Sequence, residues 1–187
     1  MFALRLASLF LLSTTFVSAS PAPAADFTAV EKRQVSTASI ETVFTTLQSS
    51  TNSTLPQITA LVSGGNATDA TVTPLIDDLT SALDTATASL AALPISLKRQ
   101  TDDDIATLVA GIITDITNAL DSLLGTASTI PALGTLLGGV DTSLNQVLLG
   151  LEILLAGVLS LVANLLTDVA GLLEQLAMGL TLGTLGL

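Results

Sequence analysis

The sequence contains no cysteine, histidine, tryptophan or tyrosine, and only five of its 187 residues are lysine or arginine. Without cysteine the chain forms no disulfides, so its fold depends on packing alone. Without histidine or cysteine it also lacks the common catalytic bases, nucleophiles and metal ligands, and offers mainly carboxylates, hydroxyls and amides. We therefore expect no enzymatic activity, no metal and no cofactor.

The acidic run Asp102-Asp103-Asp104 resembles a calcium-binding loop only in its charge. The EF-hand spacing of ligands, with its glycine and its terminal glutamate, is missing. Aspartate is also common in the first turn of a helix, where it interacts favourably with the helix dipole. We therefore interpret this run as a helix start, with Thr101 and Asp104 as a capping box.

The few cations are grouped in an unusual way. Arg5 lies near the N-terminus, and the other four form the pairs Lys32-Arg33 and Lys98-Arg99, each followed by glutamine. The net charge of −11 repels phosphate groups, so we expect no nucleic-acid binding. Paired cations on exposed segments suit the dibasic-cleaving proteases of the secretory pathway, so both pairs are candidate processing sites. An ordinary polar linker is the alternative, and it competes most strongly at the second pair.

The N-terminus has the pattern of a secretory signal peptide. Arg5 precedes the apolar run Leu6–Val17, which is too short for a membrane span, and small residues follow up to Ala19. We predict a signal peptide over 1–19, a propeptide over 20–33, and an extracellular or cell-wall location. Two sequons, at Asn52 and Asn66, are candidate N-glycosylation sites of such a secreted protein, although sequons also arise by chance in threonine-rich stretches.

Composition changes at the second dibasic pair. Residues 34–97 contain 22 serines or threonines, whereas residues 100–187 contain 24 leucines and 15 serines or threonines. The first half has helical periodicity over 35–47, from Pro56 to a stop at Gly64-Gly65, and from Thr73-Pro74 to Pro94. We predict an all-α protein in which a polar helical half, 34–97, precedes a Leu-rich helical half, 100–187.

The Leu-rich half is predicted to contain three helices. The first covers about 105–123, a short one covers 131–137 and stops at Gly138-Gly139, and the third, capped by Asp141, runs from Thr142 to Leu180 with breaks conceivable at Gly157 or Gly171. Its aliphatic face covers about half of the helix, far more than a coiled-coil seam. The residues of this face that we expect to bind an apolar interface are Leu148, Leu151, Leu155, Val158, Leu159, Val162, Leu165, Leu166, Val169, Leu172, Leu173 and Leu176.

A membrane span is the less favoured interpretation of this helix. Its longest uncharged run, Ile153–Thr167, is bounded by Glu152 and Asp168, and acidic residues at bilayer depth are costly. Fully burying one leucine contributes roughly 1.5–3 kcal/mol. So many leucines can be satisfied by folding together, by self-association, or by adsorption to a hydrophobic surface or lipid.

The signal peptide, the propeptide end Glu31-Lys32-Arg33-Gln34, the Thr/Ala-rich helices of 34–95 and the lack of cysteine resemble the hydrophobic surface-binding protein A family, which includes cell-wall galactomannoproteins. The polar and aliphatic halves are similar to a cysteine-free secreted basidiomycete protein that supports aerial hyphae and attachment. The resemblance implies a fungal wall or interface glycoprotein, and fatty-acid binding in some members. The alternatives are a helical lipid carrier and a dibasic-processed precursor of secreted peptides.

Overall fold

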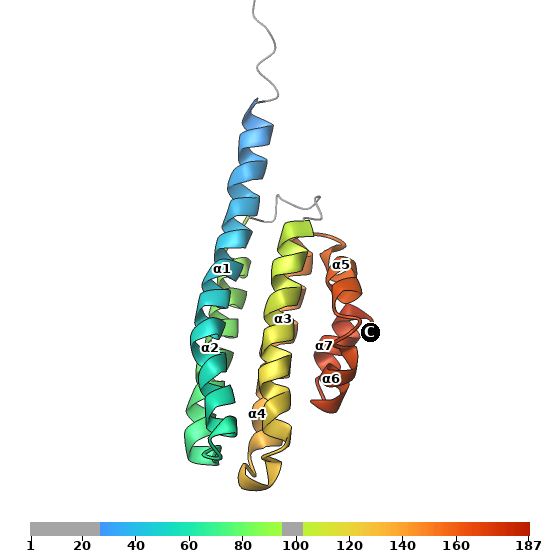
Figure 1. Cartoon of the computed structure of the whole chain (residues 1–187). Helices are drawn as coiled ribbons and strands as arrows, with labels where there is room; N and C mark the ends of the chain where they lie inside the picture. The colour runs from blue at the N-terminus through green and yellow to red at the C-terminus, as the bar shows by residue number, and fades with distance from the viewer. Residues whose placement is uncertain (1–26, 95–102) are drawn as a thin grey trace, which may run out of the picture.

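The computed structural model describes residues 27–94 and 103–187, with side chains from Ser39 onward (Figure 1). Helices α1 to α7 account for most of this part of the chain, which contains no strand, so the predicted all-α class is confirmed. Their bounds are α1 Phe27–Ser63, α2 Asp69–Ala91, α3 Asp103–Leu124, α4 Leu133–Leu154, α5 Val158–Leu165, α6 Ala170–Gln175 and α7 Gly179–Leu185, with a 3-10 helix at Ala127–Thr129.

Helix α1 is one long helix, where the sequence predicted a second helix starting at Pro56. Pro56 lies inside α1 and removes one backbone hydrogen bond, at a cost of about 3 kcal/mol in a helix interior. The helix continues because its apolar residues stay on one buried face on both sides of the proline, from Ile40 and Phe44 to Leu55 and Ile58. Packing of this face outweighs the missing hydrogen bond.

Helix α2 begins earlier than predicted. Its N-cap is Thr68, not Thr73, and Pro74 lies within the helix. The Thr68 N–H donates a 3.0 Å hydrogen bond to Thr71 Oγ1, which satisfies one of the free donors at the helix start. The apolar stripe predicted over 76–93 is buried at Ile76, Leu79, Leu83, Ala86 and Leu90, whereas Leu93 lies past the end of α2 and is half-buried.

Helix α3 agrees with the sequence prediction. It carries Asp103 and Asp104 in its first turn and ends at Leu124, next to Gly125. The other half of the predicted capping box, Thr101, lies outside the described residues. Buried positions of α3 include Ile105, Val109, Ile112, Ile116, Leu120 and Leu123.

The predicted long helix from Thr142 to Leu180 is wrong. Helix α4 already starts at Leu133 and passes through Gly138-Gly139, so these glycines stop nothing. The backbone then leaves the helix at Gly157, which has φ +85°, again between α5 and α6, and a third time at Ala177, which has φ +56°. Of the two breaks considered from sequence, only the one at Gly157 occurs, because Gly171 lies inside α6.

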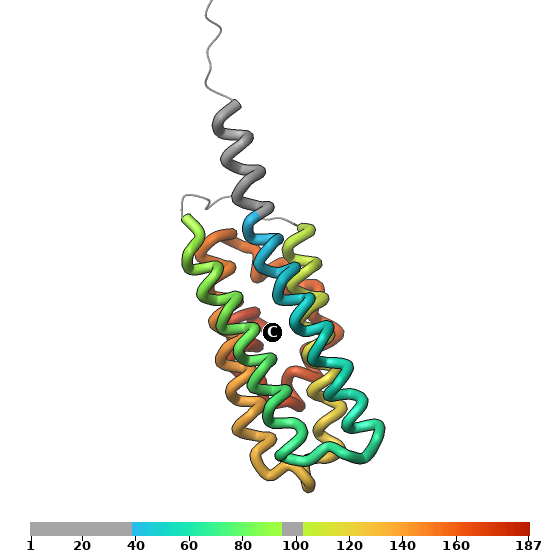
Figure 2. The backbone as a smooth tube through the Cα atoms, turned by 90° about the vertical axis from the view of Figure 1, so that its left-hand side faces the viewer, coloured from blue at the N-terminus to red at the C-terminus, as the bar shows by residue number. Residues whose placement is uncertain are grey.

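The four long helices form an up-and-down bundle in which α1 packs on α2 and α3, and α2 packs on α4 (Figures 1 and 2). Residues of both sequence halves share one hydrophobic core, from Ile40 in α1 to Leu185 in α7. The two loops at one end of the bundle are also joined, since Thr129 Oγ1 donates a 2.9 Å hydrogen bond to the Ala67 carbonyl.

Helices α3 and α4 make no extended contact with each other, although they are consecutive. The C-terminal segment, which we define as residues 158–187, fills this open side of the bundle. Helices α5 and α6 pack on α3, and α7 packs on α4. Figure 2 accordingly shows these last helices behind α1 and α2 and between α3 and α4. The short helices thus complete the core.

Candidate functional site

Most of the predicted interface residues are inside the bundle. Two of the twelve, Leu159 and Leu172, are half-buried, and Leu165 is 51% exposed. The other nine are buried: Leu148, Leu151, Leu155, Val158, Val162, Leu166, Val169, Leu173 and Leu176. The aliphatic face predicted from sequence is therefore mainly a core face in the folded chain, because α3, α4 and the C-terminal segment enclose it between them.

The exposed apolar surface nevertheless lies in the same part of the chain. Within the described residues, the large hydrophobic side chains that are exposed are Leu149, Ile153, Leu165, Leu180 and Leu187. All five come from the end of α4 or from the C-terminal segment, and none from α1, α2 or α3. Sequence reasoning missed four of them. The i, i+4 pair Leu149 and Ile153 was the signal that could have identified the exposed side of α4.

Hydrogen bonds fix how α7 lies on α4. Asp141 Oδ1 accepts 2.9 Å and 2.7 Å hydrogen bonds from the N–H and the Oγ1 of Thr181, and Oδ2 accepts one of 3.0 Å from the Leu180 N–H. One turn further along, Thr184 Oγ1 donates to Asn145 Oδ1. The two helices therefore run in parallel, with Asp141 beside Thr181 and Asn145 beside Thr184.

Asp141 corrects a further prediction. The sequence placed it at the N-cap of its own helix, whereas it lies inside α4, is 5% exposed, and binds the start of α7. Glu152 does the same for α5: its carboxylate accepts hydrogen bonds from the Gly157 N–H at 2.9 Å and the Leu159 N–H at 3.3 Å. In a stretch without cations, carboxylates thus satisfy the free N–H groups of helix starts.

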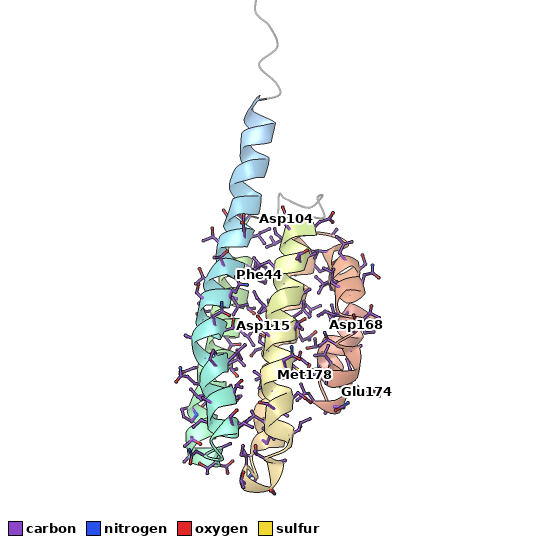
Figure 3. The ribbon with its side chains drawn as sticks, in the orientation of Figure 1. Phe44, Asp104, Asp115, Asp168, Glu174 and Met178 are labelled. Atoms are coloured by element: carbon purple, nitrogen blue, oxygen red, sulfur yellow. The ribbon has the colours of Figure 1, made fainter. Side chains whose placement is uncertain are left out.

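The remaining carboxylates of the C-terminal segment face water. Asp168 and Glu174 are exposed, on the outer side of the segment in Figure 3, whereas Met178 is fully buried toward α3. None of the side chains described, over 39–94 and 103–187, is a lysine, arginine or histidine. The polar surface of the described bundle is therefore charged by carboxylates alone.

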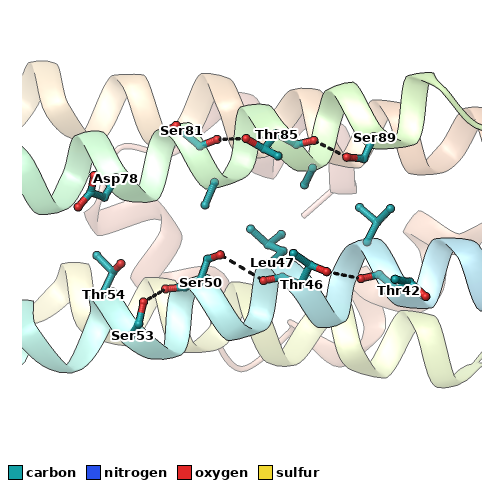
Figure 4. A pocket seen from close by; sticks show the side chains of 13 residues that line it. Thr42, Thr46, Leu47, Ser50, Ser53, Thr54, Asp78, Ser81, Thr85 and Ser89 are labelled. Atoms are coloured by element: carbon teal, nitrogen blue, oxygen red, sulfur yellow. Dashed lines mark hydrogen bonds between the residues drawn. The ribbon is translucent and has the colours of Figure 1, made fainter.

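The opposite side of the bundle is rich in hydroxyls. A groove of about 520 Å³ lies between α1 and α2 and is lined by Thr42, Thr46, Ser50, Ser81, Thr85 and Ser89 among others (Figure 4). Four of these hydroxyls donate to backbone carbonyls of the preceding turn, as Thr46 does to Thr42 at 2.8 Å and Thr85 to Ser81 at 2.8 Å. This side is therefore polar, and the exposed carboxylate of Asp78 at the same groove adds negative charge.

Two further grooves follow helix seams. One of about 670 Å³ between α1 and α3 is lined in part by Asn52, Asp115 and Asn118. Another of about 540 Å³ between α2 and α4 contains Asp84, which accepts a 2.7 Å hydrogen bond from Ser143 Oγ. Hydroxyl, amide and carboxylate groups line both grooves beside apolar side chains such as Leu55 and Ala88.

The predicted glycosylation sites are both on the polar side. Asn52 is exposed on α1, but Thr54, the third residue of its sequon, is buried at 8% exposure. Asn66 is exposed in the loop between α1 and α2, and Thr68, the third residue of its sequon, is exposed as well. The folded chain has room for a glycan at either asparagine.

The predicted processing sites lie at or beyond the edges of the described structure. Ala19, Lys98 and Arg99 are outside the described residues. Lys32 and Arg33 lie in the first turns of α1, so the predicted propeptide overlaps this helix and cleavage there requires local unwinding. A cut after Arg33 leaves the described core intact, because Ile40 is its first member.

No group of three or more acidic, histidine or cysteine side chains in the described part of the chain is placed to hold a metal ion. One described helix, α3, is long and apolar enough to cross a membrane by length and composition, and half of its most apolar window is buried in the bundle. The uncharged run Ile153–Thr167 is divided between α4 and α5.

No protein-family model matches the chain, and no curated protein sequence matches it.

Proposed function

We propose that the protein is a secreted, non-catalytic, surface-active structural protein of a fungal wall or hyphal surface, which adsorbs to hydrophobic boundaries during aerial growth or attachment. The observation that carries this proposal is the placement of the five exposed large hydrophobic residues. All of them lie from Leu149 onward, whereas α1 and α2 expose mainly serine, threonine and alanine. The folded bundle is therefore an amphiphile with a hydroxyl side and an aliphatic side.

Charge favours an uncharged boundary as the target. Since the described surface is charged by carboxylates alone, it is repelled by anionic lipid headgroups and has no cationic side chain with which to bind them. Leucine and isoleucine side chains gain free energy at oil, wax or air boundaries by leaving water. This combination supports adsorption to neutral apolar surfaces rather than to charged membranes.

The resemblance to the hydrophobic surface-binding protein A family and to the basidiomycete protein of aerial hyphae is part of this proposal. It rests on the secretory N-terminus, the dibasic sites and the contrast between the two halves. A helical lipid carrier is the second candidate. The three grooves along the helix seams give it little support, because they are open to the surface and hydroxyl groups contribute to the lining of each.

Adsorption of the secreted protein to Teflon, together with the surface tension of its solution, tests the proposal. A triple variant, Leu149→Ser, Ile153→Ser and Leu180→Ser, removes exposed apolar side chains without opening the core. The matched control replaces the exposed alanines Ala60, Ala88 and Ala91 of α1 and α2 by serine.

We expect the native protein and the alanine control to adsorb and lower the surface tension, and the triple variant to do so much less. A native protein that leaves surface tension unchanged would refute the proposal. Stoichiometric, saturable binding of a fluorescent fatty acid without adsorption would favour the carrier instead.

A further inference from the structure

In residues 148–176 the apolar residues keep the spacing of one continuous helix, although the backbone is interrupted by turns between α4, α5 and α6. Nine of the eleven buried apolar residues of this stretch follow one another at intervals of three or four, which is the period of a continuous α-helix. These nine are Leu148, Leu151, Leu155, Val158, Val162, Leu166, Val169, Leu173 and Leu176, and the other two, Leu154 and Ala163, each adjoin one of them. Separate short helices need such spacing only within each helix, not across the turns between them. Because the spacing continues across these turns, the stretch can also form one helix.

The breaks themselves are weak points. Gly157 has φ +85° and Ala177 has φ +56°, a left-handed conformation that is strained for alanine. Helices α5, α6 and α7 have 8, 6 and 7 residues, fewer than an isolated helix needs to be stable in water. The C-terminal segment therefore owes its broken form to contacts with the rest of the bundle.

Two sets of hydrogen bonds attach the C-terminal segment to the bundle. The segment also covers an apolar surface of the bundle, which we call the seat. Glu152 holds the start of α5, and Asp141 holds the start of α7, through their carboxylate oxygens. The seat includes one side of α3, where buried residues recur at helical spacing away from the groove shared with α1. These residues are Ala106, Ala110, Ile113 and Thr117. Since α5 and α6 pack on α3, lifting the segment would expose part of the buried surface of α3.

We propose that the C-terminal segment is a hinged cover. In water it closes the side of the bundle between α3 and α4. At an uncharged oil–water or air–water boundary it lifts about Gly157, and the residues after α4 straighten into a continuation of that helix. The nine buried residues and their neighbours then lie on the boundary as one aliphatic face. This inference rests on the proposed surface activity. It adds that the opened conformation is responsible for most of the adsorption.

We expect the opened aliphatic face to bind an oil or air boundary rather than a second copy of the chain. The exposed residues Leu149, Leu165 and Leu180 already give the closed form a first point of attachment to oil. The exposed carboxylates Asp168 and Glu174 of the cover repel the same charges on another copy, whereas on an oil surface they can remain in water.

A disulfide lock tests the cover, and the absence of native cysteine makes the lock specific. Asn145 and Thr184 touch through a hydrogen bond between α4 and α7, so Asn145→Cys with Thr184→Cys ties the cover shut when oxidised. The matched control, Asp84→Cys with Ser143→Cys, ties α2 to α4 at a contact of the same kind and leaves the cover free. Helix content and urea denaturation in water establish that each oxidised variant is folded.

The measurements are adsorption to hexadecane droplets and the far-ultraviolet circular dichroism of the adsorbed protein. We expect the reduced lock variant and both forms of the control to adsorb with a gain in helix content. The oxidised lock should lose that gain and most of the adsorption, and reduction should restore both.

Three results would overturn the cover. Equal adsorption and equal helix gain in the oxidised and reduced lock would show that the closed form adsorbs, which leaves the proposed function standing. Failure of the native protein to adsorb at all would remove the proposed function and the cover together. A native protein that is dimeric in water and inert toward oil would identify a second copy as the occupant.

A hinge variant provides a second readout if the lock variant does not fold. Gly157→Ala disfavours the left-handed conformation of the closed form and favours the continuous helix, so the ratio of open to closed molecules should rise about tenfold. Adsorption to hexadecane should be correspondingly faster. Unchanged or slower adsorption of a folded Gly157→Ala protein would contradict the hinge.

Discussion

At the scale of single residues, the chain replaces ion pairs by carboxylates that bind backbone N–H groups. Asp141, Glu152 and Asp69 all accept hydrogen bonds from main-chain N–H groups of segments that lie far along the chain or beyond a turn, with Asp69 Oδ1 3.4 Å from the Ala132 nitrogen. Such bonds need no cation, which suits a chain whose five lysines and arginines lie at positions 5, 32, 33, 98 and 99.

Asp141→Asn should weaken the folded state by about 2 kcal/mol, the scale of hydrogen bonds to a charged group. The amide keeps the shape of the side chain, but its NH₂ group would face an N–H donor of Leu180 or Thr181. The measurement is the free energy of unfolding in urea. The matched control is Asp77→Asn at an exposed position of α2, which should change stability by less than about 0.5 kcal/mol. Equal stabilities of the two variants would show that Asp141 does not hold α7.

The periodicity of the sequence predicted the buried side chains at this scale but not their carboxylate partners. Ile76, Leu83, Ile112 and Leu120 follow helical spacing and are buried as expected. The partner of Asp141 lies about 40 residues away in α7, a distance along the chain over which local patterns carry no information. For the same reason the predicted interface residues proved to be mostly core residues.

At the scale of secondary-structure elements, glycine and proline affect the helices according to their tertiary setting. Gly138 and Gly139 continue α4, whereas Gly157 lies in the turn between α4 and α5, where it is the N-cap of α5. Sequence rules treat such residues alike as stops. Packing decides which of them break a helix, and the buried faces of α1 and α4 carry those helices through Pro56 and the Gly138-Gly139 pair.

A pair of glycine substitutions should therefore have opposite signs. Gly157→Ala should destabilise the closed fold by about 1–2 kcal/mol, since a Cβ there meets no atom within 4 Å but the left-handed backbone is strained. Gly138→Ala should stabilise α4 by up to about 1 kcal/mol, because its surroundings are equally open and its backbone is helical. Thermal unfolding of both variants is the check. A stabilising Gly157→Ala would mean that the break at Gly157 is absent in water.

At the scale of the whole molecule, the two sequence halves are one folding unit. Helices of the polar half, α1 and α2, pack directly on α3 and α4 of the Leu-rich half, and the core contains residues from both. The composition change at Lys98-Arg99 therefore does not separate two independently packed cores.

Cleavage at Lys98-Arg99 should consequently leave the halves together. In denaturing mass spectrometry a cleaved sample shows two fragments, yet in native size-exclusion chromatography it should elute as one species at the size of the intact chain. The same sample unfolded in guanidinium provides the control, because its halves must separate. Separate elution under native conditions would support release of two peptides, the precursor alternative.

The central claim is that the folded protein meets a hydrophobic boundary with its C-terminal side and leaves α1 and α2 in water. Single nitroxide labels test it directly. The chain has no native cysteine, so one introduced cysteine gives one labelled position. The labelled positions would be Ile153 and Leu180 on the apolar side and Thr45 and Thr85 on the hydroxyl side, all exposed in water. On hexadecane droplets, labels at Ile153 and Leu180 should report an apolar environment and lose access to a water-soluble nickel relaxant, while Thr45 and Thr85 keep theirs. An apolar environment at Thr45 and Thr85, or none at Ile153 and Leu180 in adsorbed protein, would contradict the account.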